Sequence, residues 1–243
     1  MIVIPMAGFS SRFYNSGYTK PKYKLPLKGK TVFEWVMLSF ENYFESQHFK
    51  FIVKSEYEDD SFTRNMVMKL GIKSYSIHFL NSSTRGQAET VYLSIIEETA
   101  DQELLIFNID TIRKNFLMPS IPEDIFGYLE IFKGDGDHWS FVEPIGEGSN
   151  LVKRTTEKLR ISNLCSNGMY FFRSLLKFRE ICFNSINSND LHKGEFYIAP
   201  LYNTIIELGL KVQYIETSIE DNIFCGTPYE YEKLLLNTDL SLF

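Results

Sequence analysis

The sequence has few cysteines, no long apolar run and no excess of positive charge. No segment reaches the roughly 18 to 20 apolar residues that a helix needs to cross a bilayer, and no basic stretch followed by an apolar one opens the chain. Cys165, Cys182 and Cys225 lie far apart and form no C-x-x-C pair. We therefore expect a cytoplasmic protein without a zinc site or disulfide framework, whose cysteines are small buried apolar residues.

Charge and length narrow the class further. The chain has 31 acidic and 25 basic residues and a net charge of −6, which argues against broad binding to nucleic acid or to an anionic membrane. Its 243 residues suffice for a substantial core, and no linker, repeat or low-complexity tract divides them. We expect one domain over residues 1–243, with neither nucleic acid nor membrane as a partner; a homo-oligomer stays open.

The first 27 residues carry the most informative pattern, in which an apolar strand runs into a loop of small and basic residues. These are Ala7, Gly8, Ser10, Ser11, Arg12 and, ten residues further on, Lys22. Small residues let backbone N–H groups approach phosphate oxygens, and the two cations can neutralise a phosphoryl group during transfer. Taken alone, the loop is equally well an ordinary strand-to-helix turn with solvated cations.

The whole string resembles the nucleotidyltransferase family that makes nucleotide sugars, whose N-terminal pattern is a small-residue turn, G-x-x-x-R, and then K-x-x-x-P. Gly8 to Arg12 and Lys22 to Pro26 match its two halves, although the first turn has less glycine than usual. The resemblance covers most of the chain and is greatest to small capsule and surface-polysaccharide members. It implies that Arg12 and Lys22 are catalytic and that Ala7, Gly8, Ser10 and Ser11 bind the nucleotide.

Hydrophobic periodicity predicts strands that alternate with helices. We expect strands over residues 2–6, 49–54, 74–80 and 103–110, and helices over residues 31–45, 61–70 and 87–98. Thr31 and Glu34 form a T-x-x-E capping box at one helix start. This order indicates an α/β fold with a largely parallel sheet. The resemblance implies a Rossmann-like three-layer sandwich of the nucleotide-diphospho-sugar transferase type, around a mixed, mostly parallel central sheet, with an NTP-binding half at 1–115 and an acceptor-binding half at 116–243.

Asp110 is the first candidate metal ligand. It ends an apolar strand, and ligands of open α/β sheets collect at the carboxyl ends of strands. A carboxylate is a hard oxygen donor of the kind Mg²⁺ prefers, and the family holds its Mg²⁺ with an aspartate after this strand. The alternative role is a cap on the following turn.

The chain departs from the family at the second metal carboxylate. Where the family commonly has D-x-G-T, this sequence has Phe224 ahead of Cys225, Gly226 and Thr227, and a phenyl ring cannot ligate magnesium. We expect Asp221, or else Asn222, to supply the missing ligand. Otherwise Asp110, phosphates and water must suffice, which Mg²⁺ tolerates because it keeps several waters.

A turn between a strand and a helix, residues 82–88, resembles the family's base-binding turn. The resemblance implies that Gly86 and Gln87 contact the nucleotide, with the glycine allowing the backbone to approach the base. By themselves the same residues are consistent with an ordinary helix entry.

A second group of residues resembles the family's acceptor site. Glu157 and Lys158, followed by Gly168, match an E-K segment in which the carboxylate binds acceptor hydroxyls and the lysine binds the acceptor phosphate. The glycine would permit close approach. Arg154 and Arg160 remain rival phosphate ligands.

Two further segments complete the expected acceptor side. Trp139 stands in a glycine- and aspartate-rich loop that resembles the family's entry into the corresponding strand, and it would line the acceptor pocket. A G-E-x-Y run resembles that of the smaller surface-polysaccharide enzymes and implies an acceptor role for Glu195. The periodicity around it predicts a helix over residues 194–209.

These patterns together predict an Mg²⁺-dependent enzyme that transfers a nucleoside monophosphate from an NTP, with CTP, UTP or dTTP expected, to a phosphorylated acceptor. A sugar 1-phosphate is the expected acceptor, in capsule or surface-polysaccharide synthesis. A cytidylyltransferase acting on a non-sugar phosphate such as phosphocholine is the alternative within the same chemistry. A glycosyltransferase or a non-catalytic nucleotide-binding module is the alternative of a different class.

Overall fold

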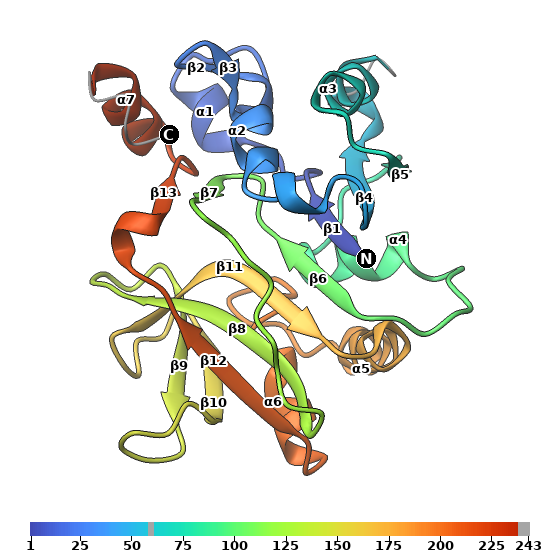
Figure 1. Ribbon diagram of the computed structural model, residues 1–243, viewed down its shortest axis with the longest axis vertical. Coiled ribbons are helices and arrows are strands. Elements are labelled where there is room, and N and C mark those ends of the chain that lie inside the picture. The colour runs from blue at the N-terminus through green and yellow to red at the C-terminus, as the bar shows by residue number, and fades with distance from the viewer. Residues whose placement is uncertain (58–60, 238–243) are drawn as a thin grey trace. The chain divides into compact units, whose positions relative to one another are not determined.

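The computed structural model describes residues 1–57 and 61–237 (Figure 1). They form two compact units, each assembled from separate stretches of the chain. One unit comprises residues 1–3, 83–107 and 119–219, and the other comprises residues 4–57, 61–82, 108–118 and 220–237. We call them the acceptor unit and the loop unit, after the predicted site residues that each contains.

The acceptor unit is built on β11, which is buried along its whole length. This strand pairs antiparallel with β6, β8 and β9, and β12 pairs in parallel with β8. On the other side of β6, Ile2 and Val3 of β1 (Ile2–Pro5) pair in parallel with Leu105 and Ile106. The bounds of the remaining strands are β6 Leu104–Phe107, β8 Ile125–Lys133, β9 Ser140–Pro144, β10 Val152–Glu157, β11 Leu164–Phe172 and β12 Lys211–Glu216.

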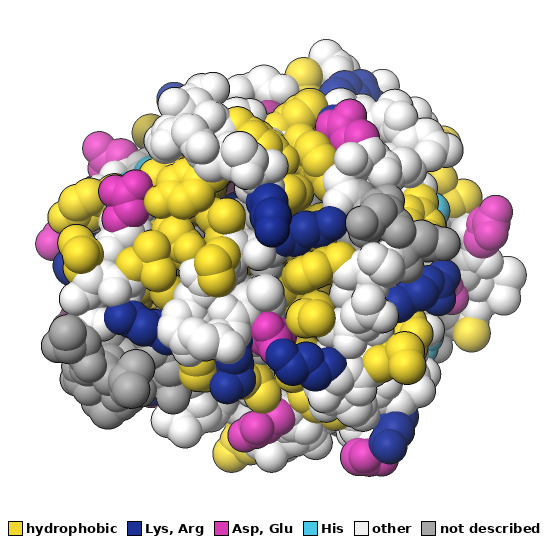
Figure 2. Space-filling model, turned by 90° about the horizontal axis from the view of Figure 1, so that it is seen from above, with side chains coloured by type: hydrophobic (Ala, Val, Ile, Leu, Met, Phe, Trp, Pro, Cys, Tyr) yellow, Lys and Arg dark blue, Asp and Glu magenta, His cyan; other side chains and the backbone are white. Residues whose placement is uncertain are grey.

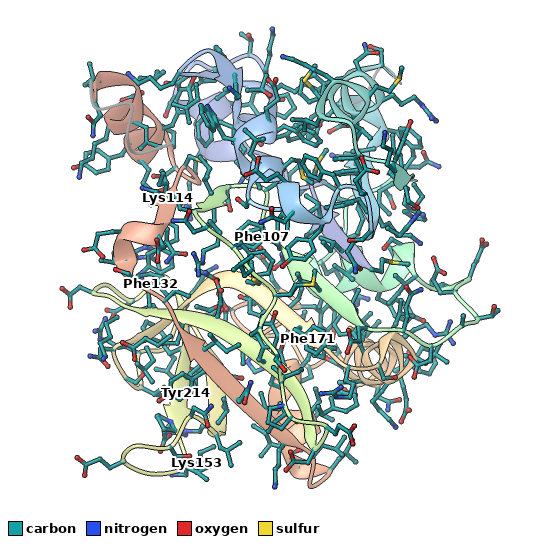
Figure 3. All side chains as sticks on the ribbon, viewed as in Figure 1. Phe107, Lys114, Phe132, Lys153, Phe171 and Tyr214 are labelled. Atoms are coloured by element: carbon teal, nitrogen blue, oxygen red, sulfur yellow. The ribbon has the colours of Figure 1, made fainter. Side chains whose placement is uncertain are left out.

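Three helices belong to this unit: α4 (Gln87–Ser94), α5 (Leu175–Asn187) and α6 (Leu201–Glu207). Tyr202 of α6 anchors its helix, because its ring stacks on Phe172 at 4.5 Å between centroids. Its buried hydroxyl lies 2.8 and 2.9 Å from the carbonyl oxygens of Tyr128 and Phe171. Figure 3 labels Phe171 on β11 and Tyr214 on β12.

The helix expected over residues 194–209 is shorter than predicted. It begins at Leu201, after Pro200 at the N-cap position, so residues 194–200 are not helical. Proline lacks an N–H group and disfavours helical backbone in the residue before it. The Phe196 N–H and C=O groups bond instead to Arg85 and Ala88. The prediction was therefore wrong for the stretch that contains Glu195.

The loop unit contains the parallel pair β4 and β5, and the Met6 N–H, just beyond β1, donates to the Ile52 carbonyl at 2.8 Å. Its strands are β4 His48–Lys54, β5 Ser74–Leu80, the pair β2 Pro26–Leu27 and β3 Lys30–Thr31, and the pair β7 Thr111–Arg113 and β13 Asn222–Phe224. Its helices are α1 Ser11–Asn15, α2 Val32–Leu38, α3 Phe62–Leu70 and α7 Pro228–Leu236. The capping box of Thr31 and Glu34 is confirmed.

The expected fold class is confirmed, since the chain has an α/β, Rossmann-like fold with a mixed, mostly parallel central sheet. Cys165, Cys182 and Cys225 are free and buried, as predicted. Within residues 1–57 and 61–237, no helix has both the length and the apolar composition that crossing a membrane requires.

Candidate active site

The signature loop leaves β1 and reaches α1 in the loop unit. Ser10, at the N-cap position, has left-handed backbone (φ +50°) and makes no side-chain cap bond. Its hydroxyl oxygen instead accepts a hydrogen bond from the Lys22 backbone N–H at 3.2 Å. Ser10 therefore ties the G-x-x-x-R half of the motif to the K-x-x-x-P half.

The signature loop has open space beside Gly8 and an exposed positive charge at Arg12. No heavy atom lies within 4 Å of the position that a Cβ on Gly8 would occupy, so packing does not require this glycine. Arg12 and Ser11 are exposed and Ala7 is partly exposed. The Arg12 side chain forms no ion pair with any residue that the structure describes. Lysine and arginine side chains lie together near the middle of the face shown in Figure 2.

Lys22 meets Asp110 in the same unit, although 88 residues separate them in sequence. The lysine ammonium and the carboxylate form a direct ion pair, and each side chain is about one-fifth exposed. Asp110 was expected to end a strand, but β6 already ends at Phe107, so Asp110 lies three residues further on, in the turn between β6 and β7. Two of the predicted site residues are thus brought into contact.

Residues 225 and 226 hold Asp110 from the other side. The Cys225 N–H donates to the Asp110 carbonyl oxygen at 2.9 Å, and the Cys225 thiol lies 3.2 Å from the same oxygen. A Cβ on Gly226 would lie 2.8 Å from the Asp110 Oδ2 atom, so the space beside that oxygen depends on the glycine. Burial, together with the Asp110 carboxylate, raises the pKa of the Cys225 thiol and keeps it protonated.

The structure does not bring Asp221 beside Asp110. The antiparallel β7–β13 ladder runs from Thr111 opposite Phe224 to Arg113 opposite Asn222. Asp221 lies at its far end, where the Asp221 carbonyl oxygen accepts from the Lys114 N–H at 2.9 Å and the carboxylate lies 3.9 Å from Arg113 Nη1 (Lys114 is labelled in Figure 3).

The spacing of that ladder separates the two carboxylates. Four strand residues, at roughly 3.3 Å each, place about 13 Å of ladder between the Asp110 and Asp221 positions. Among residues 1–57 and 61–237, no group of three or more His, Cys, Asp or Glu side chains is arranged to hold a metal ion. Of the two expected metal ligands, only Asp110 therefore lies beside Lys22.

The predicted base-binding turn lies in the acceptor unit, where Gly86 precedes α4. Gly86 has φ +144°, and its carbonyl oxygen accepts from the Thr90 N–H at 3.1 Å and lies 3.0 Å from the Thr90 hydroxyl. Gln87 is the first residue of α4 and is partly exposed. The Gly86 carbonyl thus ties the turn to α4, and Gln87 begins that helix.

Glu157 ends β10 and is largely buried. Its carboxylate accepts a hydrogen bond from the Ser140 hydroxyl, and Ser140 lies 3.3 Å from the Tyr170 hydroxyl. Burial raises the pKa of Glu157, the Glu195 carboxylate adds to this effect, and Ser140 and Lys158 oppose it. A carboxyl group in this setting suits hydrogen bonding to a neutral polar group.

Lys158, the next residue, has left-handed backbone with φ +51°. Its ammonium donates to the Tyr197 hydroxyl and lies 4.6 Å from the centroid of the same ring. Burial acts to lower the pKa of Lys158, but the Tyr197 hydrogen bond and the Glu157 and Glu195 carboxylates raise it overall. The lysine is therefore a permanent cation, held in place by one tyrosine.

Gly168 lies at an irregularity in the pairing of β11 with β8, where it has φ +92°. The side chains of Ser166 and Asn167 accept hydrogen bonds from the Gly168 and Met169 N–H groups at 3.2 and 3.1 Å. The buried Asn167 amide also donates to Glu130 at 2.7 Å. This network keeps an irregular backbone in a fully buried strand.

Trp139 is placed beside the E-K pair by its backbone, because its carbonyl oxygen accepts from the Lys158 N–H at 2.9 Å. Its ring packs edge-to-face on Phe132 at 5.1 Å. Glu195 is exposed and affects both the Glu157 and Lys158 pKa values.

Sequence reasoning missed three residues of this arrangement: Tyr197, Ser140 and Gly226. Tyr197 stands in the G-E-x-Y run and Gly226 in the D-x-G-T position, so both had a sequence signal. Nothing in the sequence separates Ser140 from other serines.

Comparison with protein-family models finds no match, and comparison with curated proteins finds none either. Solved structures do match. The nucleoside-diphosphate-sugar pyrophosphorylase from Vibrio cholerae RC9 is 45% identical with a TM-score of 0.93, over 98% of this chain and 100% of that one.

Two more distant structures share the fold. One is the inositol-1-phosphate CTP transferase from T. maritima, which is 14% identical with a TM-score of 0.71 over 96% of this chain and 94% of that one. The other is a putative glucose-1-phosphate thymidylyltransferase from Bacillus anthracis, which is 16% identical with a TM-score of 0.75 over 99% of this chain and 98% of that one. At that identity they speak for the fold alone. The near-complete match at 45% identity shows the family. The chain belongs to the nucleotidyltransferase family of nucleoside-diphosphate-sugar pyrophosphorylases.

Proposed function

We propose that this enzyme transfers a nucleoside monophosphate from CTP, UTP or dTTP to a sugar 1-phosphate and releases pyrophosphate. The observation that carries the proposal is the contact between Lys22 and Asp110, which joins the K-x-x-x-P motif to the carboxylate after β6. The relative of known structure, a nucleoside-diphosphate-sugar pyrophosphorylase, supports the reaction class. A role in capsule or surface-polysaccharide synthesis is part of the same proposal and rests on the sequence resemblance.

The loop unit supplies the cations that such a transfer needs. The exposed guanidinium of Arg12 and the ammonium of Lys22 would bind the triphosphate and stabilise the negative charge that develops on the leaving pyrophosphate. Ser10 fixes the spacing of these two residues through its bond to the Lys22 backbone. Little covalent chemistry is asked of the protein, so positioning and charge carry the rate.

The acceptor unit supplies the groups for the nucleophile. Lys158 would hold the acceptor phosphate, which is already anionic near neutral pH and needs no general base. Glu157 would bind acceptor hydroxyls from its largely buried position beside Ser140, with Gly168 and Trp139 alongside. Glu195 is the exposed acidic neighbour of this group.

Magnesium fits the donor set at one carboxylate. Asp110 offers a hard oxygen ligand. Its Oδ2 atom is paired with the Lys22 ammonium, and Gly226 places no side chain against that atom, where a Cβ would lie at 2.8 Å. Asp221 lies at the other end of the ladder near Arg113, so we propose that Asp110 holds the ion together with substrate phosphates and water. Bound there, Mg²⁺ would neutralise phosphate charge.

The test is pyrophosphate release with Mg²⁺ from each of CTP, UTP, dTTP, GTP and ATP, paired with sugar 1-phosphates, phosphocholine and other small phosphate monoesters. We expect release to require one NTP and one acceptor. Phosphocholine as the sole acceptor would establish the cytidylyltransferase alternative. Absence of release from folded protein that still binds an NTP would refute the transferase proposal.

Lys22→Ala provides the matching variant. We expect turnover to fall at least about a hundredfold, because the lysine cation stabilises the transition state, while the folded fraction stays unchanged. Lys73→Ala is the control, since Lys73 also forms an ion pair in the loop unit, at 3.7 Å to Glu45, but on the surface. Near-normal turnover in Lys22→Ala would contradict the assignment.

A further inference from the structure

The turn at residues 85–88 and the segment at residues 194–197 are bonded backbone to backbone. The Phe196 N–H donates to the Arg85 carbonyl oxygen at 2.8 Å, and the Ala88 N–H donates to the Phe196 carbonyl oxygen at 3.0 Å. Both polar backbone groups of Phe196 are thus used, one on each side of Gly86. Two segments of the acceptor unit that lie far apart in sequence are joined through one residue.

Gly86 is required by this contact. A Cβ at this position would lie 2.4 Å from the Phe196 carbonyl oxygen and 2.6 Å from its nitrogen. These are backbone atoms, which cannot swing away as the end of a flexible side chain can. The space above Gly86 is therefore filled by the protein itself, and the glycine serves the approach of residues 194–197.

Side chains reinforce the same contact. The Arg85 guanidinium lies 4.8 Å from the centroid of the Phe196 ring. The same guanidinium forms an ion pair with Glu89, with 2.5 Å between Arg85 Nη2 and Glu89 Oε1. The Phe196 side chain is 2% exposed, so it has little room to move. Displacement of the turn must therefore displace the segment.

The segment leads directly to the acceptor lysine. Tyr197 follows Phe196, and its hydroxyl accepts the hydrogen bond of the Lys158 ammonium. On the other side, the partly exposed Gln87 directly precedes Ala88. Two hydrogen bonds, Ala88 to Phe196 and Lys158 to Tyr197, together with the chain links from Gln87 to Ala88 and from Phe196 to Tyr197, thus connect Gln87 with Lys158.

We propose that Phe196 is a positioning residue that couples the nucleotide-base turn to the acceptor site. Nucleotide bound to the turn beside Gln87 would fix residues 194–197, hold Tyr197 against Lys158 and so raise the affinity for the phosphorylated acceptor. The acceptor would raise the affinity for nucleotide by the same factor. The inference rests on the proposed function for the identity of the two ligands. Phe196 acts through the turn and through Tyr197.

Hydrogen exchange tests the coupling without turnover. The probe is a mixture of CTP, UTP and dTTP with Mg²⁺ and no acceptor, added to the wild-type protein. We expect slower exchange both at residues 85–88 and at residues 194–197. Protection at 85–88 without any change at 194–197 would overturn the coupling while leaving nucleotide binding intact. No protection at either segment would overturn the coupling together with the nucleotide assignment.

Gly86→Ala breaks the contact, and Gly209→Ala is its control. Gly209 also has positive φ (+79°), but nothing lies within 4 Å of its Cβ position, so the control replaces a positive-φ glycine without creating the clash. We expect exchange at 194–197 to rise roughly tenfold in Gly86→Ala and no longer to respond to nucleotide. If Gly86→Ala does not fold, the wild-type measurement alone decides.

Kinetics supply the second readout, with the NTP and acceptor that release most pyrophosphate. In Gly86→Ala, measured at saturating NTP, we expect the acceptor KM to rise by about tenfold. Gly209→Ala should match the wild type. An unchanged acceptor KM in folded Gly86→Ala would refute the coupling.

Discussion

The absence of a side chain at Gly226 allows the Asp110 carboxylate to keep its position. Gly226→Ala would bring a Cβ to 2.8 Å from Asp110 Oδ2, so we expect the carboxylate to be displaced and the apparent affinity for Mn²⁺, measured by calorimetry with bound NTP, to fall about tenfold. Gly146→Ala is the control, because Gly146 has no heavy atom within 4 Å and no positive φ. Equal Mn²⁺ affinity in both variants would show that Gly226 does not position Asp110.

Glu157 gives a pH-dependent stability with a defined sign. Burial raises its pKa, so the folded state binds more protons than the unfolded state between the unfolded and folded pKa values. The unfolding free energy contributed by this group therefore falls as pH rises through that window. Glu157→Gln removes the titration, and we expect it to stabilise the protein more at pH 8 than at pH 4, measured by urea unfolding.

If Glu157→Gln stabilised the protein equally at both pH values, or more at pH 4 than at pH 8, the raised pKa of Glu157 would be contradicted. Ser140→Ala is the companion variant, because Ser140 donates to the carboxylate and opposes the rise in its pKa. Its removal should widen the window of pH dependence.

The meeting of Lys22 with Asp110 agrees with sequence reasoning, because Lys22 stands in a recognisable loop motif and Asp110 at the predicted carboxyl end of a strand. The separation of Asp221 from Asp110 could not be predicted. It depends on the register of β7 against β13, which no local pattern reports. The role of Gly86 was likewise hidden, because the atoms that exclude its side chain belong to Phe196, far along the chain.

Helix α2 begins with a complete capping box. The Thr31 hydroxyl accepts from the Glu34 N–H at 3.2 Å, and the Glu34 carboxylate accepts from the Thr31 N–H at 2.7 Å. We expect Thr31→Ala to lower the unfolding free energy by about 1 kcal/mol, measured by urea unfolding. Thr31→Ser keeps the hydroxyl and should lose less than half as much, and equal losses would show that the cap bond is not the cause.

The starts of α2 and α4 could be predicted better than their ends, whereas the start of α6 was predicted worse than its end. Local capping chemistry sets the start at Thr31, whereas α2 ends at Leu38, directly before Ser39, whose hydroxyl oxygen accepts from the Arg113 N–H of β7 at 2.9 Å. The end of α4 at Ser94 falls before Glu97 and Glu98, which are unfavourable at a helix C-terminus. Both helices are therefore shorter than hydrophobic periodicity alone predicts.

For the whole chain, the fold class can be predicted from the alternation of strands and helices, and the order of the site residues along the sequence can be predicted from the motifs. The division into two units cannot be predicted from the sequence. Each unit takes stretches from the beginning, middle and later part of the sequence, so no composition change marks where one yields to the other. Strand pairing between distant segments, such as β1 with β6, decides which residues belong together.

Binding of the correct nucleotide should stabilise the folded chain by mass action. At a concentration about 100 times Kd, an NTP with Mg²⁺ adds about 2.7 kcal/mol, because it binds the native state and not the unfolded one. For a chain of this size each kcal/mol raises Tm by about 2 to 4 °C, so we expect a shift of about 5 to 11 °C in a calorimetric scan.

The comparison among nucleotides makes this shift diagnostic. If CTP, UTP or dTTP is the substrate, one of them should raise Tm well above ATP and GTP at equal concentration, since base-specific contacts add to contacts with the shared triphosphate. Arg12→Ala should reduce the shift for every NTP alike, because Arg12 is proposed to bind the triphosphate, whereas Gln87→Ala should reduce only the preferred one. Equal shifts for all five nucleotides would place binding on the phosphates alone and remove Gly86 and Gln87 from the nucleotide site.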